Sequence, residues 1–148
     1  MPTPTDNKTL YDRDYALWLD SQVRALKSHN YQALDLENLI EEIEDMGRNN
    51  KNALRSYLTR LLEHLLKLHY WETERDWNRN GWIEEINTFR DEIEGLLEAS
   101  PSLKNHLQSI YPERLAKAKK NVNKLFPVPQ DAHITLEQAL NPDFLPEG

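Results

Sequence analysis

Apolar residues recur in alternating steps of four and three over one long segment, and this period constrains the fold more than any other feature of the sequence. The stripe consists of Leu36, Ile40, Ile43, Gly47, Asn50, Leu54, Tyr57, Leu61, His64 and Leu68. Residues with this spacing share one face of an α-helix. With Asp35 as the N-cap, the pattern predicts a helix over residues 36–71 that is about 50 Å long.

The middle of this helix is its weak point. Gly47 is followed by three asparagines before residue 53, and glycine and asparagine are poor helix formers. One continuous helix and two helices joined near Gly47 are therefore both open. The four-three rhythm keeps its phase across the gap, so we favour one continuous helix.

Other segments of the chain show the same helical period. They cover residues 12–28, 81–99 and 101–125. Ser100 and Pro101 mark the boundary before the last of them, as N-cap and first helical residue. Pro112 must kink or split that helix, because proline has no amide donor and crowds the preceding turn. We expect the polar and aromatic residues 72–80 to form a connection.

The composition also favours helices over strands. Leu occurs 23 times and Val 3 times, and the chain has only 4 Gly. Amphipathic segments joined by short connections bury their apolar faces most simply against one another. We therefore predict an all-α fold, an antiparallel helical bundle of about four helices in a single domain over 1–148. Residues 1–10 are expected to be flexible, and 127–148 to form a Pro-rich C-terminal strap with a short helix capped by Thr135.

Several classes of protein are disfavoured by what the sequence lacks. Without cysteine, it has no disulfide, no thiolate zinc site and no cysteine nucleophile. The longest apolar run, Tyr15 to Leu19, is far shorter than the roughly 20 residues of a membrane span. The N-terminus does not have the order of a secretion signal. We expect a cytoplasmic protein without a membrane partner.

Carboxylates and one histidine on the long helix suggest a metal site. Glu41 and Glu44 share a helix face, and His64 lies within the apolar stripe. The Glu-x-x-His pair of di-iron bundles is absent, and about 30 Å of helix separates Glu44 from His64 unless the chain folds back. A core histidine with solvated acids nearby is the simpler interpretation, and we expect no cofactor.

The same acidic segment also suggests a cation-dependent phosphohydrolase. Its carboxylates, which resemble the magnesium-binding acids of helical nucleotide pyrophosphohydrolases, are Glu41, Glu42, Glu44 and Asp45. A second acidic set would be needed, and Asp91, Glu92 and Glu94 are available. No Gly-rich phosphate loop or hydrolase motif accompanies them. Enzymatic activity is therefore left undecided.

A basic strip gives an alternative of another class. The net charge is -7, yet residues 102–126 carry six bases and one acid. Among these bases, Arg114, Lys117, Lys120 and Lys124 follow helical steps of three and four. Cations in such a row neutralise successive phosphates, so nucleic-acid binding is one interpretation, with Tyr111 as a stacking residue. Pairing with neighbouring acidic helices is the simpler one.

Tryptophan and arginine side chains gather at the end of the long helix. The cluster consists of Trp71, Arg75, Trp77, Arg79 and Trp82. Such a cluster either plugs the end of a bundle or forms a platform for a partner, because Trp and Arg are enriched at interaction hot spots. Our leading hypothesis is a protein-interaction or regulatory module that binds a protein partner or forms a homodimer.

Five separated blocks of the sequence resemble domain-of-unknown-function family 29, a family of small bacterial proteins abundant in cyanobacteria. The blocks are Tyr11–Leu19, Asp35–Gly47, His64–Lys67, Ser100–Leu103 and Thr135–Pro146. The resemblance implies an all-helical single domain in the bacterial cytoplasm. It brings no established activity, ligand or catalytic residue.

Overall fold

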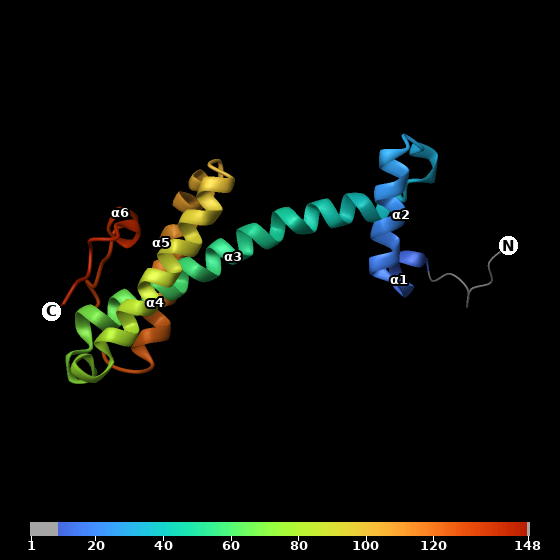
Figure 1. Ribbon diagram of the computed structural model, residues 1–148. Helices are drawn as coiled ribbons and strands as arrows, with labels where there is room; N and C mark the ends of the chain where they lie inside the picture. Colours follow the sequence, from blue (N-terminus) through green and yellow to red (C-terminus); the bar gives the residue numbers. More distant parts are fainter. Residues whose placement is uncertain (1–8, 148) are drawn as a thin grey trace. The chain divides into compact units, whose positions relative to one another are not determined.

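A computed structural model describes residues 9–147, and within this range every regular element is a helix (Figure 1). The all-α helical bundle predicted from the sequence is confirmed. Residues 1–8 of the expected flexible segment lie outside the described residues. The chain divides into two compact units, residues 1–48 and 49–148.

Helix α3 (Leu36–Tyr70) contributes residues to both units and is unbroken. Gly47 is exposed and helical, and a Cβ atom added there would meet nothing within 4 Å. The favoured single helix is therefore confirmed, because nothing at Gly47 or at the asparagines after it interrupts the backbone ladder.

The first unit contains α1 (Leu10–Arg13), α2 (Tyr15–Lys27), the 3-10 turn η2 (Tyr31–Ala33) and the start of α3. One helix was expected over 12–28, but the chain breaks at Asp14, which is extended with φ −153°. The Asp14 carboxylate accepts a hydrogen bond from the Leu17 amide at 3.1 Å. A capping side chain thus ends α1 and begins α2.

The buried face of α2 is not the face that its apolar spacing predicts. Trp18, Gln22 and Ala25 are buried, whereas Leu19 and Val23 are exposed. The Trp18 indole donates a hydrogen bond to Asp35 Oδ2 at 3.0 Å, and the Asp35 amide donates to Gln22 Oε1 at 2.8 Å. These polar contacts turn the buried face by one residue, roughly 100° around the helix.

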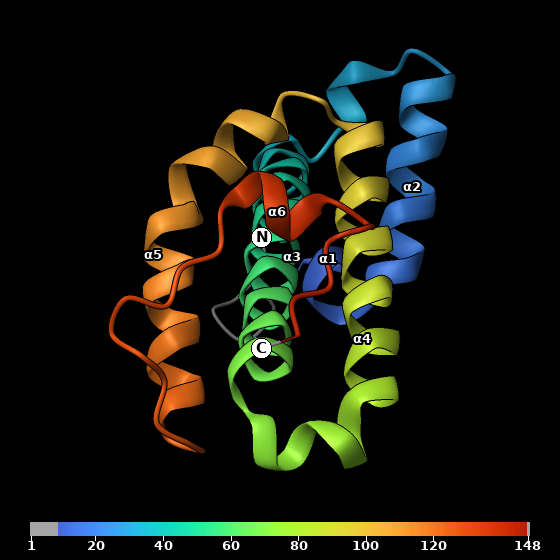
Figure 2. The same ribbon diagram turned by 90° about the vertical axis from the view of Figure 1, so that its left-hand side faces the viewer.

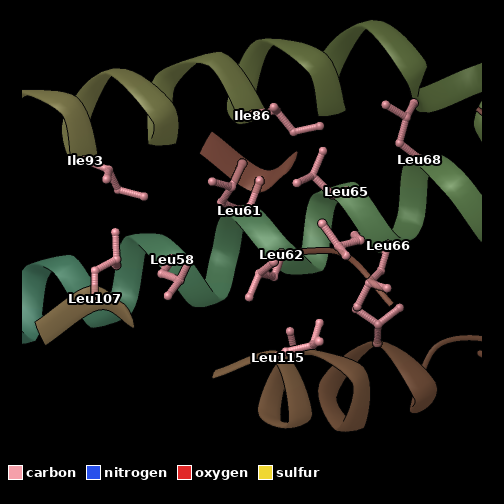
Figure 3. Close-up of a cluster of buried hydrophobic side chains, with 14 of the residues drawn as sticks. Leu58, Leu61, Leu62, Leu65, Leu66, Leu68, Ile86, Ile93, Leu107 and Leu115 are labelled. Carbon is pink, nitrogen blue, oxygen red and sulfur yellow. The ribbon is translucent and has the colours of Figure 1, made fainter. Parts of the chain in front are cut away.

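The second unit is built on the part of α3 that follows Arg48, together with α4 (Glu72–Ala99) and α5 (Leu103–Asn123). Figure 2 shows α4 running beside α3 in the opposite direction, and α5 on the other side of α3. In Figure 3, Leu61 and Leu65 point towards Ile86 of α4, while Leu62 and Leu66 point towards Leu115 of α5. Leucines of α3 therefore fill the centre of this core.

The C-terminal segment after Phe126 packs against the core of the second unit. Ala132, Ile134 and Ala139 are buried there, and α6 (Leu136–Leu140) begins with a capping box at Thr135. Buried Arg90 of α4 donates hydrogen bonds to the carbonyls of Ala139 and Phe144, each at 2.8 Å. The Pro-rich strap predicted from the sequence is confirmed (Figure 2).

Three local expectations differ from the structure. Residues 72–80 are not a connection but the first turns of α4, since they contain neither glycine nor proline and begin with acids that suit a helix N-terminus. Helix α5 starts at Leu103, so Pro101 is not its first helical residue. Pro112 lies inside α5 without splitting it, and Figure 2 shows the first turns of α5 at an angle to the rest, in agreement with a kink, the other predicted alternative. Leu125 lies beyond α5 and is exposed.

Among residues 9–147, no helix has both the length and the apolar character needed to cross a membrane.

Candidate functional site

The residues proposed for a metal site have other partners in the structure. His64 Nδ1 lies 2.8 Å from the Arg60 carbonyl oxygen, and its Nε2 pairs with Glu85 of α4. Glu44 pairs with Arg48 at 3.7 Å, and Glu41 is exposed. Within the described part of the chain, no group of three or more His, Asp or Glu side chains is arranged to hold a metal ion.

The acids proposed as a second hydrolase set lie on α4. Asp91 and Glu94 line a pocket beside the strap, where Arg90 and Lys104 also lie. Glu42, from the first acidic set, accepts hydrogen bonds from the hydroxyls of Tyr11 and Tyr15. These bonds hold the pKa of both tyrosines above its ordinary value. Glu42 thus joins the helices of the first unit.

The tryptophan cluster is mostly packed. The Trp71 ring stacks on Trp82 and on Phe126, with centroids 5.9 and 4.8 Å apart. Arg75 donates a hydrogen bond to the His69 carbonyl at 2.7 Å, and burial together with this guanidinium lowers the pKa of His69. Trp71 and Trp82 therefore help to close one end of the second unit.

Two members of the cluster reach the surface. Trp77 is 87% exposed. Arg79 Nε donates to Glu147 Oε1 at 2.8 Å, and this ion pair lowers the pKa of Glu147. Any partner at this position would meet one indole and a guanidinium that already has a carboxylate partner. The platform at residues 71–82 remains a prediction.

An apolar stripe lies exposed on α3 in the first unit. It consists of Leu36, Ile40, Ile43 and Met46, which are 60%, 54%, 64% and 64% exposed. Glu42 of the same helix bonds to tyrosines of α1 and α2, and the first three stripe residues lie roughly 100–160° around α3 from Glu42. Helices α1 and α2 therefore leave the stripe uncovered.

A row of carboxylates runs along one side of this stripe. The acidic row consists of Glu37, Glu41 and Glu44, each directly following a stripe residue in the sequence. All three side chains are exposed. Residues 9–48 carry nine acidic and four basic side chains. The stripe is thus an apolar surface with a strongly negative border.

A basic groove lies between α3 and α5 in the second unit. It has a volume of about 650 Å³. Its α3 side consists of Asn52, Arg55, Ser56, Thr59, Arg60 and Glu63, and its α5 side of Arg114, Lys117 and Asn121. Residues of each side recur at steps of three and four, so each helix turns one polar face to the groove. Four cations therefore line it against one carboxylate.

Arg114 is the least exposed of these cations. It is 8% exposed, and its Nε is buried without a hydrogen-bond partner, while Nη2 pairs with the exposed carboxylate of Glu113. A buried guanidinium group with an unused donor is costly, because each lost bond to water is left unreplaced.

The basic strip expected on α5 is divided between environments. Arg114 and Lys117 line the basic groove, whereas Lys120 lines a separate shallow pocket near Pro129 and Lys124 is exposed. Tyr111 does not line the groove, and burial raises its pKa to about 12. Arg55 and Arg60 were not among the site residues predicted from the sequence. They lie five residues apart, about 140° around α3, so their spacing alone did not indicate a common site, and only the packing of α5 beside α3 places them in one groove.

The chain is similar to one known protein family. A family model described as "Domain of unknown function DUF29" matches residues 10–145, which confirms the resemblance drawn from the sequence. No curated protein and no solved structure matches the chain.

Proposed function

The chain belongs to the family described as Domain of unknown function DUF29, and we propose that it is a protein-interaction module whose first unit binds an amphipathic helix with a basic border. The observation that carries this proposal is the exposed apolar stripe of α3, with Leu36, Ile40 and Ile43 each more than half exposed. Apolar patches rimmed by polar residues are typical of protein-binding sites.

Charge selects the kind of partner. The acidic row Glu37, Glu41 and Glu44 borders the stripe, so a helix that carries lysine or arginine beside its apolar face is complementary to it. A second copy of the chain is disfavoured, because two identical stripes would bring two acidic rows together.

The expected binding is weak and reversible. Full burial of a leucine or isoleucine side chain contributes roughly 1.5–3 kcal/mol. Association costs at least about 4 kcal/mol in lost translational and rotational freedom. Three half-exposed apolar side chains and a screened charged row leave little beyond that cost, so we expect micromolar or weaker affinity.

A synthetic helical peptide with a leucine face bordered by lysines tests this function. We expect a fluorescently labelled peptide of this kind to bind the full chain, as measured by anisotropy. A peptide in which glutamates replace the lysines should bind much more weakly. The double variant Ile40→Gln/Ile43→Gln should weaken the lysine peptide at least about tenfold, since it removes the centre of the stripe.

The matched control is Val23→Gln/Leu26→Gln, which changes two exposed apolar residues of α2. It should leave binding unchanged. Equal loss in both double variants, or equal binding of both peptides, would contradict the proposal. Light scattering gives a separate outcome: a dimer that becomes monomeric only in Ile40→Gln/Ile43→Gln would identify a second copy as the occupant and overturn the heterologous partner.

A further inference from the structure

The basic groove of the second unit offers a site that the proposed function does not use. It shares no residue with the apolar stripe and lies wholly within residues 49–148. Along α3 it extends from Asn52 to Glu63, about 16 Å at 1.5 Å per residue. Cations are distributed along this length rather than gathered at one point.

The charge balance inside the groove is unusual for this protein. The whole chain has a net charge of -7, yet Arg55, Arg60, Arg114 and Lys117 line the groove together. The single lining carboxylate, Glu63, accepts a hydrogen bond from the Asn121 amide at 2.7 Å. Like charges held in one groove repel one another, and a bound anion would relieve that repulsion.

The buried guanidinium of Arg114 gives an independent indication of a ligand. The residue is more than nine-tenths buried, lines the groove, and has an Nε donor without a partner. Its one ion-pair partner, Glu113, is a 70% exposed side chain. An arginine fork with an unfilled donor is well suited to an oxyanion, which accepts several parallel hydrogen bonds.

The chemistry of the lining identifies the class of anion. No aromatic or large aliphatic side chain lines the groove, so it offers no surface for a base or an acyl chain. Cations, amides and the Ser56 hydroxyl instead suit phosphate oxygens. On α3 the two cations, Arg55 and Arg60, lie five residues apart, which is more than one helical turn along the groove. We propose that this groove binds a run of phosphate groups, supplied by a polyphosphate chain or by the backbone of a single-stranded nucleic acid.

Direct binding measurements on the full chain test this site. The probes are tripolyphosphate, measured by calorimetry, and a fluorescein-labelled uridine oligonucleotide, measured by anisotropy at low and moderate salt. We expect binding of at least one probe, weakened by salt as phosphate contacts require. Arg60→Glu and Lys117→Glu should each reduce the affinity at least about tenfold, because each replaces an attraction by a repulsion. Both residues are exposed, and circular dichroism will verify the fold of each variant.

Lys104→Glu is the matched control, since Lys104 is an exposed cation on α5 that does not line the groove. It should change the affinity less than about twofold. Tripolyphosphate binding without oligonucleotide binding identifies a polyphosphate chain as the ligand, and oligonucleotide binding identifies a strand. No binding of either probe at low salt overturns the proposal, as does equal weakening by all three substitutions. If inorganic phosphate binds as tightly as tripolyphosphate, the groove binds a single phosphate group, and the proposal of a run of phosphate groups is wrong. The peptide assay of the first unit is unaffected by these results, so the two proposals fail separately.

Discussion

Arg114 carries a buried positive charge whose hydrogen-bonding capacity the described residues do not fill. Its Nε has no partner, and its ion pair with Glu113 reaches a carboxylate that water already solvates. This arrangement does not favour stability, because a buried charge loses its hydration. Replacing such a charge by an apolar side chain is often neutral or stabilising. The proposed phosphate ligand would give this guanidinium the counter-charge that the described residues do not supply.

Arg114→Met is therefore expected to stabilise the ligand-free protein by about 1 kcal/mol, since methionine keeps the apolar stem and removes the charge. Urea unfolding followed by circular dichroism measures this change. The same variant should lose the stabilisation that tripolyphosphate gives the wild type. A variant that is destabilised without ligand, by contrast, would show that Arg114 is primarily structural.

Asp35 joins α2 to the first turn of α3. Its carboxylate accepts hydrogen bonds from the Asn38 side chain at 2.8 Å and from the Trp18 indole at 3.0 Å. The bond from Asn38, followed by the one from Trp18, holds the pKa of Asp35 below its ordinary value, although partial burial opposes this shift. The fold thus favours the ionised form.

Asp35→Ala should destabilise the first unit by about 1 kcal/mol at neutral pH, because it removes a helix cap and leaves the buried indole without its acceptor. Hydrogen exchange of residues 15–27 measures the loss, and the exposed Asp20→Ala serves as the control. The wild-type contribution is fully present above the ordinary carboxyl pKa near 4 and is lost as the pH falls through the lower folded-state value. The difference between wild type and Asp35→Ala should therefore shrink in acid, and a constant difference would contradict this role.

At the scale of elements, Gly47 is the point where α3 has least reason to be helical. Glycine in a helix interior costs roughly 0.5–1 kcal/mol relative to alanine. A Cβ atom at Gly47 or at Gly95 of α4 would meet nothing within 4 Å. The two glycines therefore lie in different helices, α3 and α4, but each has room for a methyl group.

Gly47→Ala and Gly95→Ala should each stabilise the chain by about 0.5–1 kcal/mol and raise the helical signal or the unfolding midpoint. Denaturant unfolding and far-ultraviolet circular dichroism measure both effects. Gly95→Ala is the internal standard. A gain at Gly95 with none at Gly47 would mean that α3 is not helical around residue 47 in solution.

Most elements of this fold could be predicted from the sequence, because their formation depends on a local period. Leu54 to Leu68 has a strict helical rhythm, and α3 follows it. Asp14 was missed, since an acid near a helix start is equally suited to the first turn and to the N-cap. Pro112 was expected to kink or split its helix, and α5 continues through it without a split. Its effect depends on packing that no local pattern encodes.

The candidate sites could be predicted only in part. Arg114 and Lys117 follow a visible basic strip on one helix. Arg55 and Arg60 belong to the same groove, but only the packing of α5 against α3 brings them opposite that strip. The apolar stripe at Leu36 and Ile40 was taken as part of a buried face, because the period gives the face of a helix and does not show whether a neighbour covers it.

At the scale of the whole molecule, the two units differ in how much core each has. Only Trp18, Gln22 and Ala25 are buried among the described residues of the first unit. The second unit buries a continuous cluster that includes seven leucines of α3, with Leu107 of α5 and Ile134 of the strap. Apolar burial is the main favourable term in folding, so local stability should follow this difference.

If the first unit opens independently, residues 15–46 are expected to exchange amide hydrogens at least about tenfold faster than residues 54–122. A tenfold difference in rate corresponds to a free energy of opening that is about 1.4 kcal/mol lower for the first unit. Hydrogen-exchange mass spectrometry of the full chain measures both segments in one sample.

Asp35→Ala should accelerate exchange only in residues 15–46. Leu62→Ala opens a cavity in the core of the second unit, so it should accelerate exchange in residues 54–122 and lower the midpoint of urea unfolding. Saturation of the apolar stripe with the lysine peptide should slow exchange in residues 15–46, since binding stabilises the folded form of the unit that it contacts. Equal exchange in both segments, with each substitution affecting both alike, would instead establish one cooperative unit, as the single domain expected from the sequence requires.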